Sequence, residues 1–150
     1  MIRFNYNDGG RLATGYKGKA SDCVCRAICI VTGLSYDEVY ATLAHGNANQ
    51  KRGKYENKNK AGKRTAANGI NTKRKWFENY MKELGFEWVP TMKVGQGCKV
   101  HLTENELPSG KIIVNVSRHF AAVINGVLND TYDCSRGGTR CVYGYYKYKK

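Results

Sequence analysis

Apolar side chains recur along this chain at two different spacings, and the change of spacing divides the chain into two parts. Up to residue 86, three segments (21–32, 35–45 and 72–86) carry apolar residues three or four positions apart, the repeat of a helix with one buried face. Beyond residue 86, short β-branched or aromatic runs are separated by turn residues, as in strands. This order predicts an α+β domain in which N-terminal helices pack on a C-terminal antiparallel β-sheet.

The ends of the first two predicted helices are marked by residues that favour helix termini. Ser21 or Asp22 can act as the N-cap of the first helix, and Gly33 can take the left-handed conformation that ends it. Ser35 with Glu38 three positions later forms the capping-box pattern that opens the second helix. We therefore expect two consecutive helices, the second ending near residue 45.

The third helix and the strands are predicted from similar local signals. The third helix has five apolar residues at helical spacing and a terminal glycine: Trp76, Phe77, Tyr80, Met81, Leu84 and Gly85. Strands are predicted in five runs: 87–94, 111–118, 119–126, 127–133 and 141–149. Asn125-Gly126 is a strong signal for a two-residue hairpin turn between two of these strands.

Residues 46–71 interrupt the helical part with a polar, basic stretch almost free of aliphatic side chains. The flanking segments are each too small to hold a core, so we interpret this stretch as a loop inserted in a single domain that spans 1–150. Its basic side chains are candidates for binding an acidic partner: Lys51, Arg52, Lys54, Lys58, Lys60, Lys63 and Arg64.

Composition and charge narrow the class of protein. The hydrophobic content of 41% and the eleven tyrosines are typical of a folded chain, and 150 residues suffice for one core. The formal net charge of +13 favours polyanionic partners such as nucleic acid or an acidic protein surface. No apolar run is long enough to span a bilayer, so no membrane partner is expected.

The six cysteines are expected to be mainly free thiols. The N-terminus is polar and lacks the apolar core of a signal peptide, so we expect a cytoplasmic protein, and the cytosol keeps thiols reduced. Cys25 and Cys29 fit the buried stripe of the first helix. Cys134 and Cys141 flank a loop and could bridge or bind a metal, although ordinary thiols are the favoured interpretation. No Cys-x2-Cys pair is present, and neither a metal nor a cofactor is expected.

Cys23 differs from the other cysteines because it lies in the first turn of a predicted helix. A thiol there is either a small core residue or a nucleophile. A helix N-terminus together with a nearby imidazolium lowers a thiol pKa, and the resulting thiolate attacks carbonyl carbon. His119 is a candidate for that imidazole, because it opens a predicted strand and its ring can reach past the sheet edge.

The predicted hairpin selects a carboxylate partner for His119. With a two-residue turn at 125–126, residues paired across the two strands sum to about 251, which places His119 opposite Tyr132. Asp130 is then a diagonal neighbour on the same face, close enough to orient the imidazole. Asp133 would point to the other face. We therefore expect Cys23, His119 and Asp130 to act together.

The stretch "KASDCVCRAICIVTG" resembles the nucleophile helix of papain-like cysteine peptidases, in particular the small phage and bacterial members related to bacteriocin-processing peptidases. Those proteins carry an Asp-Cys pair at the helix start, as Asp22-Cys23 does here. The segment 109–145 resembles their strand–His–hairpin–Asp region. The resemblance covers roughly positions 13–45 and 104–146. It implies a papain-like fold, a peptide or protein substrate, and, for a phage-encoded member, action in the host cytoplasm.

The resemblance also implies roles for individual residues. Cys23 would be the nucleophile, His119 the general base and acid, and Asp130 the residue that orients the imidazole. The backbone N–H of Cys23 would supply one oxyanion donor. The family usually adds an upstream Gln or Asn side chain, and "GYKGKASD" has neither. Asn5, Asn7, Ser21 or a backbone amide remain the alternatives for this second donor.

Two functions are therefore carried forward. The first is a cysteine-dependent hydrolase, a peptidase that forms an acyl-enzyme on Cys23. The alternative is a catalytically inactive papain-like protein that binds nucleic acid or an acidic host protein through its basic loop. A peptidase that recruits an acidic substrate through the loop would combine the two.

Overall fold

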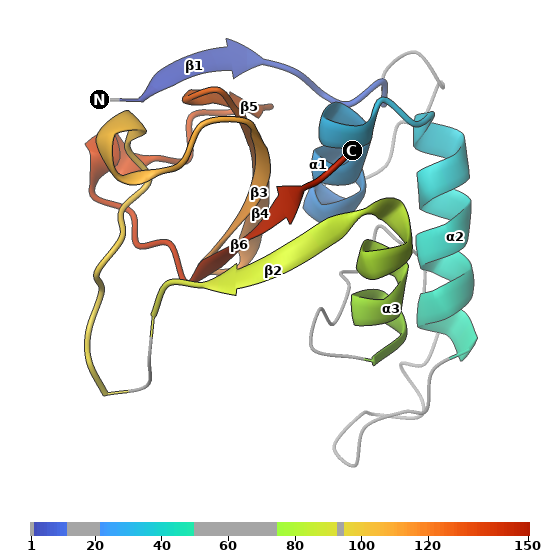
Figure 1. Ribbon diagram of the computed structural model, residues 1–150. Coiled ribbons are helices and arrows are strands. Elements are labelled where there is room, and N and C mark those ends of the chain that lie inside the picture. The colour runs from blue at the N-terminus through green and yellow to red at the C-terminus, as the bar shows by residue number, and fades with distance from the viewer. Residues whose placement is uncertain (1, 12–21, 50–74, 93–94) are drawn as a thin grey trace, which may run out of the picture.

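Three helices pack on one side of a curved sheet of six strands in the computed structural model of the chain (Figure 1). The structure describes residues 2–11, 22–49, 75–92 and 95–150. Residues 50–71 of the predicted basic loop, with its seven candidate residues, lie outside these ranges, as does Ser21, whereas residues 46–49 belong to the second helix. The α+β class predicted from the sequence is confirmed.

The helices begin and end close to the predicted positions. They are α1 (Cys23–Thr32), α2 (Tyr36–Asn49) and α3 (Lys75–Leu84). Gly33 ends α1 with φ 77°, and its N–H donates to the carbonyl of Cys29 at 2.9 Å. The hydroxyl of Ser35 accepts the N–H of Glu38 at 3.3 Å, which is one half of the expected capping box. The second helix continues four residues beyond its predicted end at His45.

The sheet is mixed, which corrects the expectation of an antiparallel sheet. The strands are β1 (Arg3–Tyr6), β2 (Phe86–Pro90), β3 (Lys111–Val116), β4 (His119–Ile124), β5 (Val127–Asp130) and β6 (Gly144–Tyr148), and their order in space is β1-β5-β4-β3-β6-β2. Two short 3₁₀ turns, Glu104–Glu106 and Arg136–Gly138, lie between strands. All pairings are antiparallel except β1 with β5, which run parallel.

The edge strand β1 was not predicted, although Phe4 and Tyr6 alternate with Arg3 and Asn5, because the run is only four residues long and leads directly into a turn-rich segment. All four of its residues are exposed, and its position is fixed by backbone pairing that sets Tyr6 opposite Asp130. Its side chains add one hydrogen bond to the sheet, from the amide of Asn5 to the oxygen of Asn129 at 2.8 Å. Only the neighbouring residue Ile2 is buried in the core.

The hairpin between β4 and β5 has the predicted two-residue turn. Asn125 and Gly126 both have positive φ, 48° and 79°, as a type I′ turn requires. Ile124 pairs with Val127, so paired residues sum to 251 as expected. The register that selects Asp130 as the partner of His119 is therefore confirmed.

Two apolar layers cover the two faces of the sheet. The layer between the sheet and the helices is centred on Phe77 of α3, whose ring contacts those of Phe120 and Tyr146 edge to face. Cys25 and Cys29 are buried in this layer, as predicted. The second layer fills the inside of the curved strands. Its buried residues are Ile2, Leu102, Ile112, Val114, Val116, Ala121, Val123, Leu128, Cys134 and Val142.

The helix α1 lies between the sheet and α2, and this position explains its composition (Figure 1). Seven of its ten residues are buried. A helix covered on both sides is apolar around most of its circumference. One charged residue, Arg26, is nevertheless among the buried seven, with 3% of its surface exposed.

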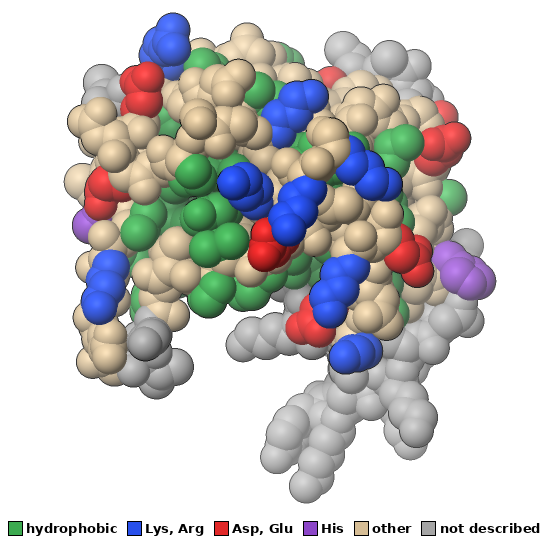
Figure 2. Space-filling model, in the orientation of Figure 1, with side chains coloured by type: hydrophobic (Ala, Val, Ile, Leu, Met, Phe, Trp, Pro, Cys, Tyr) green, Lys and Arg blue, Asp and Glu red, His purple; other side chains and the backbone are tan. Residues whose placement is uncertain are grey.

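The surface carries apolar groups next to basic ones. Figure 2 shows hydrophobic side chains gathered over the strands, with Lys and Arg side chains around them. The exposed large side chains are Phe4, Tyr6, Leu34, Trp88, Met92, Tyr132 and Tyr143. None of the described helices combines the length and the apolarity needed to cross a bilayer.

Cys98 and Cys141 form a disulfide, which corrects the expectation that the cysteines are thiols. The two Cα atoms are 5.9 Å apart, although 43 positions separate the residues in the chain. A bridge between His101 and Cys141 aligns the two segments. The pairing could not be predicted from the sequence, because no local pattern relates two cysteines that lie 43 positions apart. Cys23, Cys25, Cys29 and Cys134 are free.

The disulfide closes a long loop, so its removal should destabilise the fold. Replacing Cys98 and Cys141 by Ser should lower the free energy of unfolding by up to about 4 kcal/mol, because the unfolded chain regains the entropy of the open loop. Urea unfolding with and without dithiothreitol measures this. The reductant should destabilise the natural chain and leave the double variant unchanged. Equal stability of the oxidised chain and the variant would contradict the expectation.

Candidate functional site

Cys23 is the first residue of α1, and its side chain is partly exposed. The first N–H groups of a helix have no partner within the helix and carry a partial positive charge. A thiolate at this position is therefore stabilised by the helix terminus, as the sequence predicts.

His119 and Asp130 form a buried hydrogen bond across the β4–β5 hairpin. The distance from His119 Nε2 to Asp130 Oδ2 is 2.6 Å, and the two residues are 8% and 3% exposed. An ionised carboxylate only accepts hydrogen bonds, so Nε2 carries the proton in this pair. In the neutral ring, Nδ1 is then the nitrogen that can accept a proton from a thiol.

The diagonal contact predicted from the hairpin register is thus present. The rings of His119 and Tyr132 also lie side by side, with centroids 5.4 Å apart, as expected for residues opposite each other. Asp133, which was predicted to point to the other face, binds a different neighbour. Its carboxylate accepts the N–H and the hydroxyl of Ser135, at 3.0 and 2.6 Å.

Opposing effects set the pKa of the Cys23 thiol. Burial raises this pKa, while the hydrogen bond to the His119 ring and the positive charge of that ring lower it. The backbone of Phe120 and the charge of Arg26 lower it further. The net result is a pKa below the usual value of a thiol, which favours the thiolate.

The pKa of His119 moves in the opposite direction. Burial lowers it, but hydrogen bonds with Asp130, Cys134 and Cys23 outweigh this effect and raise the pKa to about 12. A lowered thiol pKa beside a raised imidazole pKa favours the thiolate–imidazolium pair near neutral pH. Cys25, by contrast, is held as a thiol, because its contact with Cys29 and its burial both raise its pKa.

Cys134 is a second thiol next to the imidazole, and the sequence did not indicate it as part of the site. Its sulfur lies within 4.8 Å of ligand atoms of His119 and Asp130. A nitrogen, an oxygen and a sulfur at this spacing are donors that Zn²⁺ accepts, with a fourth ligand to complete a tetrahedron. The 2.6 Å distance between His119 Nε2 and Asp130 Oδ2 is that of a hydrogen bond, in which a proton lies between the two atoms.

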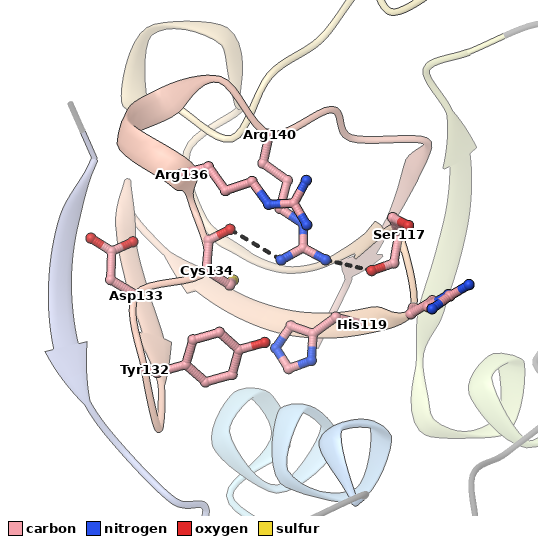
Figure 3. A pocket seen from close by; sticks show the side chains of 8 residues that line it. Ser117, His119, Tyr132, Asp133, Cys134, Arg136 and Arg140 are labelled. Atoms are coloured by element: carbon pink, nitrogen blue, oxygen red, sulfur yellow. Dashed lines mark hydrogen bonds between the residues drawn. The ribbon is translucent and has the colours of Figure 1, made fainter.

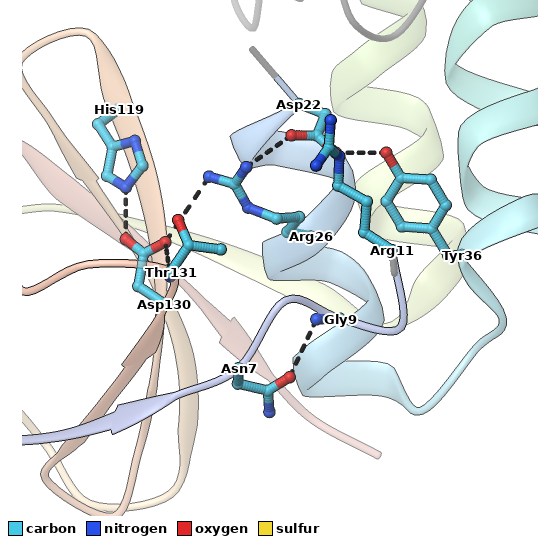
Figure 4. Close-up of polar contacts among 9 residues, drawn as sticks. All are labelled: Asn7, Gly9, Arg11, Asp22, Arg26, Tyr36, His119, Asp130 and Thr131. Atoms are coloured by element: carbon cyan, nitrogen blue, oxygen red, sulfur yellow. Dashed lines mark hydrogen bonds and ion pairs between the residues drawn. The ribbon is translucent and has the colours of Figure 1, made fainter. Parts of the chain in front are cut away.

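Arg26 connects the helix to the carboxylate that holds His119 (Figure 4). Its guanidinium lies 2.6 Å from Asp22 Oδ1 and 3.7 Å from Asp130 Oδ1. The sequence predicted that Arg26 pairs with a carboxylate. It did not indicate that one guanidinium reaches two carboxylates, one on its own helix and one on β5.

Asp22 precedes α1 at the N-cap position, but its side chain does not cap the helix, which corrects the predicted role. The carboxylate is buried and binds other donors instead. It lies 3.2 Å from Arg11 Nε and also accepts the hydroxyl of Tyr36 from α2, in addition to the Arg26 contact. These three contacts, two of them with charged guanidiniums, stabilise the buried carboxylate more than hydrogen bonds to the backbone N–H groups of the helix would.

The N-terminal segment packs closely against this network. Gly9 has φ 69°, and a Cβ atom there would lie 2.9 Å from the carbonyl oxygen of Arg26. The side-chain oxygen of Asn7 accepts the N–H of Gly9 at 2.9 Å and fixes this turn (Figure 4). The backbone N–H of Asn7 also donates to the carbonyl of Asp130. The turn therefore closes over α1 next to the end of β5.

Of the two asparagines considered as oxyanion donors, Asn5 has its donor nitrogen engaged elsewhere, whereas the hydrogen bond at Asn7 uses its oxygen and not its donor nitrogen. The amide nitrogen of Asn5 donates to Asn129, and the amide oxygen of Asn7 accepts Gly9. The described residues thus support the backbone N–H of Cys23 as one donor and leave the side-chain donor unassigned.

Two cavities lie next to the site. The first, of about 500 Å³, is polar and has His119 in its wall; we call it the His119 cavity (Figure 3). Its lining residues are Ser117, Arg118, His119, Tyr132, Asp133, Cys134, Arg136 and Arg140. The second, of about 850 Å³, is a more apolar groove along β2 and β6, and Phe120 and Trp88 are in its wall. The backbone of Phe120 also contacts Cys23, so each cavity borders the Cys23–His119 pair through one residue of β4.

No protein-family model, curated protein or solved structure matches this chain. The function must therefore be inferred from the arrangement of the side chains. The three residues predicted from the sequence to act together lie close to one another in the structure: Cys23, His119 and Asp130. The neighbours that the sequence did not indicate, Cys134 and Arg140, come from the irregular segment between β5 and β6, where no periodicity shows which way a side chain points.

Loss of Arg26 should destabilise the fold, because it leaves two buried carboxylates short of their shared cation. We expect Arg26→Met to lower the free energy of unfolding by about 3–5 kcal/mol. Arg26→Lys should lose less, since one ammonium keeps a charge but cannot serve both carboxylates. Urea unfolding measures both effects. Arg3→Met on exposed β1 is the matched control, with a change within about 0.5 kcal/mol. A similar loss for Arg3→Met and Arg26→Met would contradict this account.

The lowered pKa of Cys23 should depend on His119. Alkylation of Cys23 by iodoacetamide should reach half of its maximal rate at a pH below that of a free thiol, about 8.5. In His119→Ala the midpoint should move up, because only the smaller effects of Phe120 and Arg26 then oppose the rise in thiol pKa that burial causes. Mass spectrometry of the modified peptide separates Cys23 from Cys134. His101→Ala, which changes a half-buried histidine outside both cavities, should leave the midpoint unmoved. An unshifted midpoint in His119→Ala would show that the two groups do not interact.

Proposed function

We propose that the protein is a cysteine-dependent hydrolase, a peptidase with a papain-like arrangement of Cys23, His119 and Asp130. The observation that carries the proposal is the buried 2.6 Å hydrogen bond from His119 to Asp130, with the imidazole also contacting the thiol at the N-terminus of α1. A nucleophile, a base within reach and a third group that orients the base are the parts of an activated thiol. The order of these residues along the chain is that of the resembling peptidases.

The reaction begins with the thiolate. Cys23 attacks the carbonyl carbon of a peptide bond, and the carbonyl oxygen gains the negative charge. The backbone N–H of Cys23 at the helix terminus is placed to stabilise that charge. His119, protonated by then, donates its proton to the leaving nitrogen, the C–N bond breaks, and an acyl-thioester remains on Cys23.

Hydrolysis of the thioester reverses the roles. The neutral His119 takes a proton from water as the oxygen attacks the thioester carbonyl, and the C–S bond breaks to release the acid and the thiolate. Asp130 keeps the Nε2–H orientation of the ring through both steps, so Nδ1 faces the reacting atoms. Arg26 holds the Asp130 carboxylate and acts as a positioning residue.

The groove next to Phe120 is suited to the acyl side of a substrate. Its wall carries Phe86, Trp88 and Tyr146, and it borders the pair through Phe120. An apolar side chain of a peptide could be buried there. A peptide or protein substrate is thus consistent with the size and chemistry of the groove.

Substitutions at the three positions test the proposal directly. Incubation with a library of internally quenched peptides should give cleavage that Cys23→Ala abolishes and His119→Ala lowers by about 1,000-fold or more. Asp130→Asn should lower cleavage by about 10- to 1,000-fold, because the ring loses its orientation and its counter-charge. His101→Ala and Asp37→Asn are matched controls on residues outside both cavities and should retain activity.

A covalent intermediate is the second readout. Mass spectrometry after rapid acid quench should show an acyl adduct on Cys23 and on no other cysteine. Cleavage that survives in Cys23→Ala, or the absence of both cleavage and adduct with the natural chain, would refute the proposal.

A further inference from the structure

The His119 cavity holds positive charge for which the proposed hydrolysis has no use. Arg118, Arg136 and Arg140 line it, together with a single acidic residue, Asp133. Arg118 and Arg136 are exposed and form no ion pair with the residues that the structure describes. Asp133 accepts two hydrogen bonds from Ser135 at Oδ1, and its single charge is outnumbered by three guanidiniums. The cavity therefore has an excess of cationic donors.

Arg140 is the strongest sign of a ligand. It is only 8% exposed, and its guanidinium donates to the carbonyl oxygens of Cys134, at 3.3 Å, and of Ser117 (Figure 3). Its Nε is buried and has no hydrogen-bond partner among the described residues. A guanidinium has five N–H donors, so several remain after the two carbonyls are served. A buried cation with carbonyl partners and no carboxylate is unfavourable until an anion approaches it.

The backbone holds two of these arginines in an uncommon conformation. Arg118 has φ 56° and Arg136 has φ 54°, in the left-handed region where glycine is the usual residue. Arg118 belongs to the two-residue turn that leads directly into His119. Non-glycine residues held in this region cluster at functional sites, although tight hairpin turns such as that of Asn125 also use it. Each position has an arginine, although a glycine would adopt the same backbone conformation without strain.

The cavity lies on one side of the reacting pair. His119 is part of its wall and Cys23 is not. In the proposed reaction the acyl group is bound to the sulfur, and the leaving amine receives its proton from the imidazole. A cavity that has the imidazole in its wall is therefore close to the leaving part of the substrate.

We propose that the His119 cavity binds a carboxylate group on the leaving-group side of the scissile bond, so that the enzyme selects acidic leaving peptides. This specificity rests on the proposed function. The carboxylate can be an Asp or Glu side chain or the terminal carboxylate of the leaving peptide. The planar guanidinium of Arg140 matches a carboxylate through two parallel hydrogen bonds. Asp133 on the same wall disfavours a doubly charged phosphate.

Binding can be measured without catalysis on the Cys23→Ala chain. Amide NMR spectra of the ¹⁵N-labelled protein are recorded with N-acetylglutamate α-amide, with N-acetylglutamine, with N-acetylglutamine α-amide and with inorganic phosphate. The first carries a side-chain carboxylate, the second a terminal carboxylate and the third none. At least one of the first two should shift the amides of residues 117–119 and 132–136, and the third should not. The more effective of the two identifies the source of the carboxylate.

Variants of the exposed arginines test the site without disturbing the buried one. Arg118→Gln with Arg136→Gln should weaken carboxylate binding about tenfold, because two charge-assisted contacts are lost. Arg140→Met should weaken it further if the variant folds, which the same spectra report. Arg3→Gln on β1 is the control and should bind as the parent does. Equal shifts from N-acetylglutamine α-amide, tighter binding of phosphate, or unchanged affinity of the double variant would each overturn the inference.

Cleavage of the peptide library by the natural chain is the second test of the carboxylate site. Peptides with Asp or Glu, or with a free terminal carboxylate, on the leaving side should be cleaved at least about tenfold faster than the Gln or amide counterparts. The double arginine variant should lose this ratio. Cleavage without any such preference would overturn the inference and leave the proposed function standing. Carboxylate binding without cleavage of any peptide would refute the proposed function and the leaving-group role together.

Discussion

The carboxylate of Asp130 is the contact through which the helical and the sheet parts of the site are held together. One oxygen binds the imidazole of His119, and the other faces the guanidinium of Arg26 on the helix that begins with Cys23. The relative position of thiol and imidazole is thus set by a buried charge network in addition to apolar packing. Loss of one partner in such a network leaves an uncompensated charge, so the arrangement is rigid and sensitive to substitution.

Burial has opposite consequences for the two groups that this network positions. It raises the pKa of the Cys23 thiol and lowers that of the His119 imidazole, and both effects oppose the ion pair. The mutual contact of the two groups and the charge of Asp130 reverse both tendencies. The thiolate thus depends on three residues from α1, β4 and β5 being in place at once, which local sequence cannot guarantee.

The cationic wall of the His119 cavity adds a second electrostatic constraint. Three arginines line the same cavity as the imidazolium, and Asp130 together with the contacts to Cys23 and Cys134 offsets their repulsion. A bound carboxylate in the cavity would reduce the repulsion and stabilise the protonated ring that donates to the leaving amine. The charge of the substrate carboxylate would then contribute both to binding and to proton transfer. The groove beside Phe120 differs in charge, because its wall combines aromatic rings with two glutamates that largely balance its three lysines.

The sequence by itself determined the elements whose signals are local. Helical spacing and capping residues located the three helices, and the Asn125-Gly126 turn fixed a register in which side-chain alternation alone selects Asp130 for His119. The tertiary structure decided what depends on residues far apart in the chain. It placed β1 parallel to β5, joined Cys98 to Cys141, turned Asp22 from a cap into the partner of Arg26, and brought Arg140 beside His119. A carboxylate or a thiol has several possible partners of similar strength, and only the packed core determines which of them comes within reach.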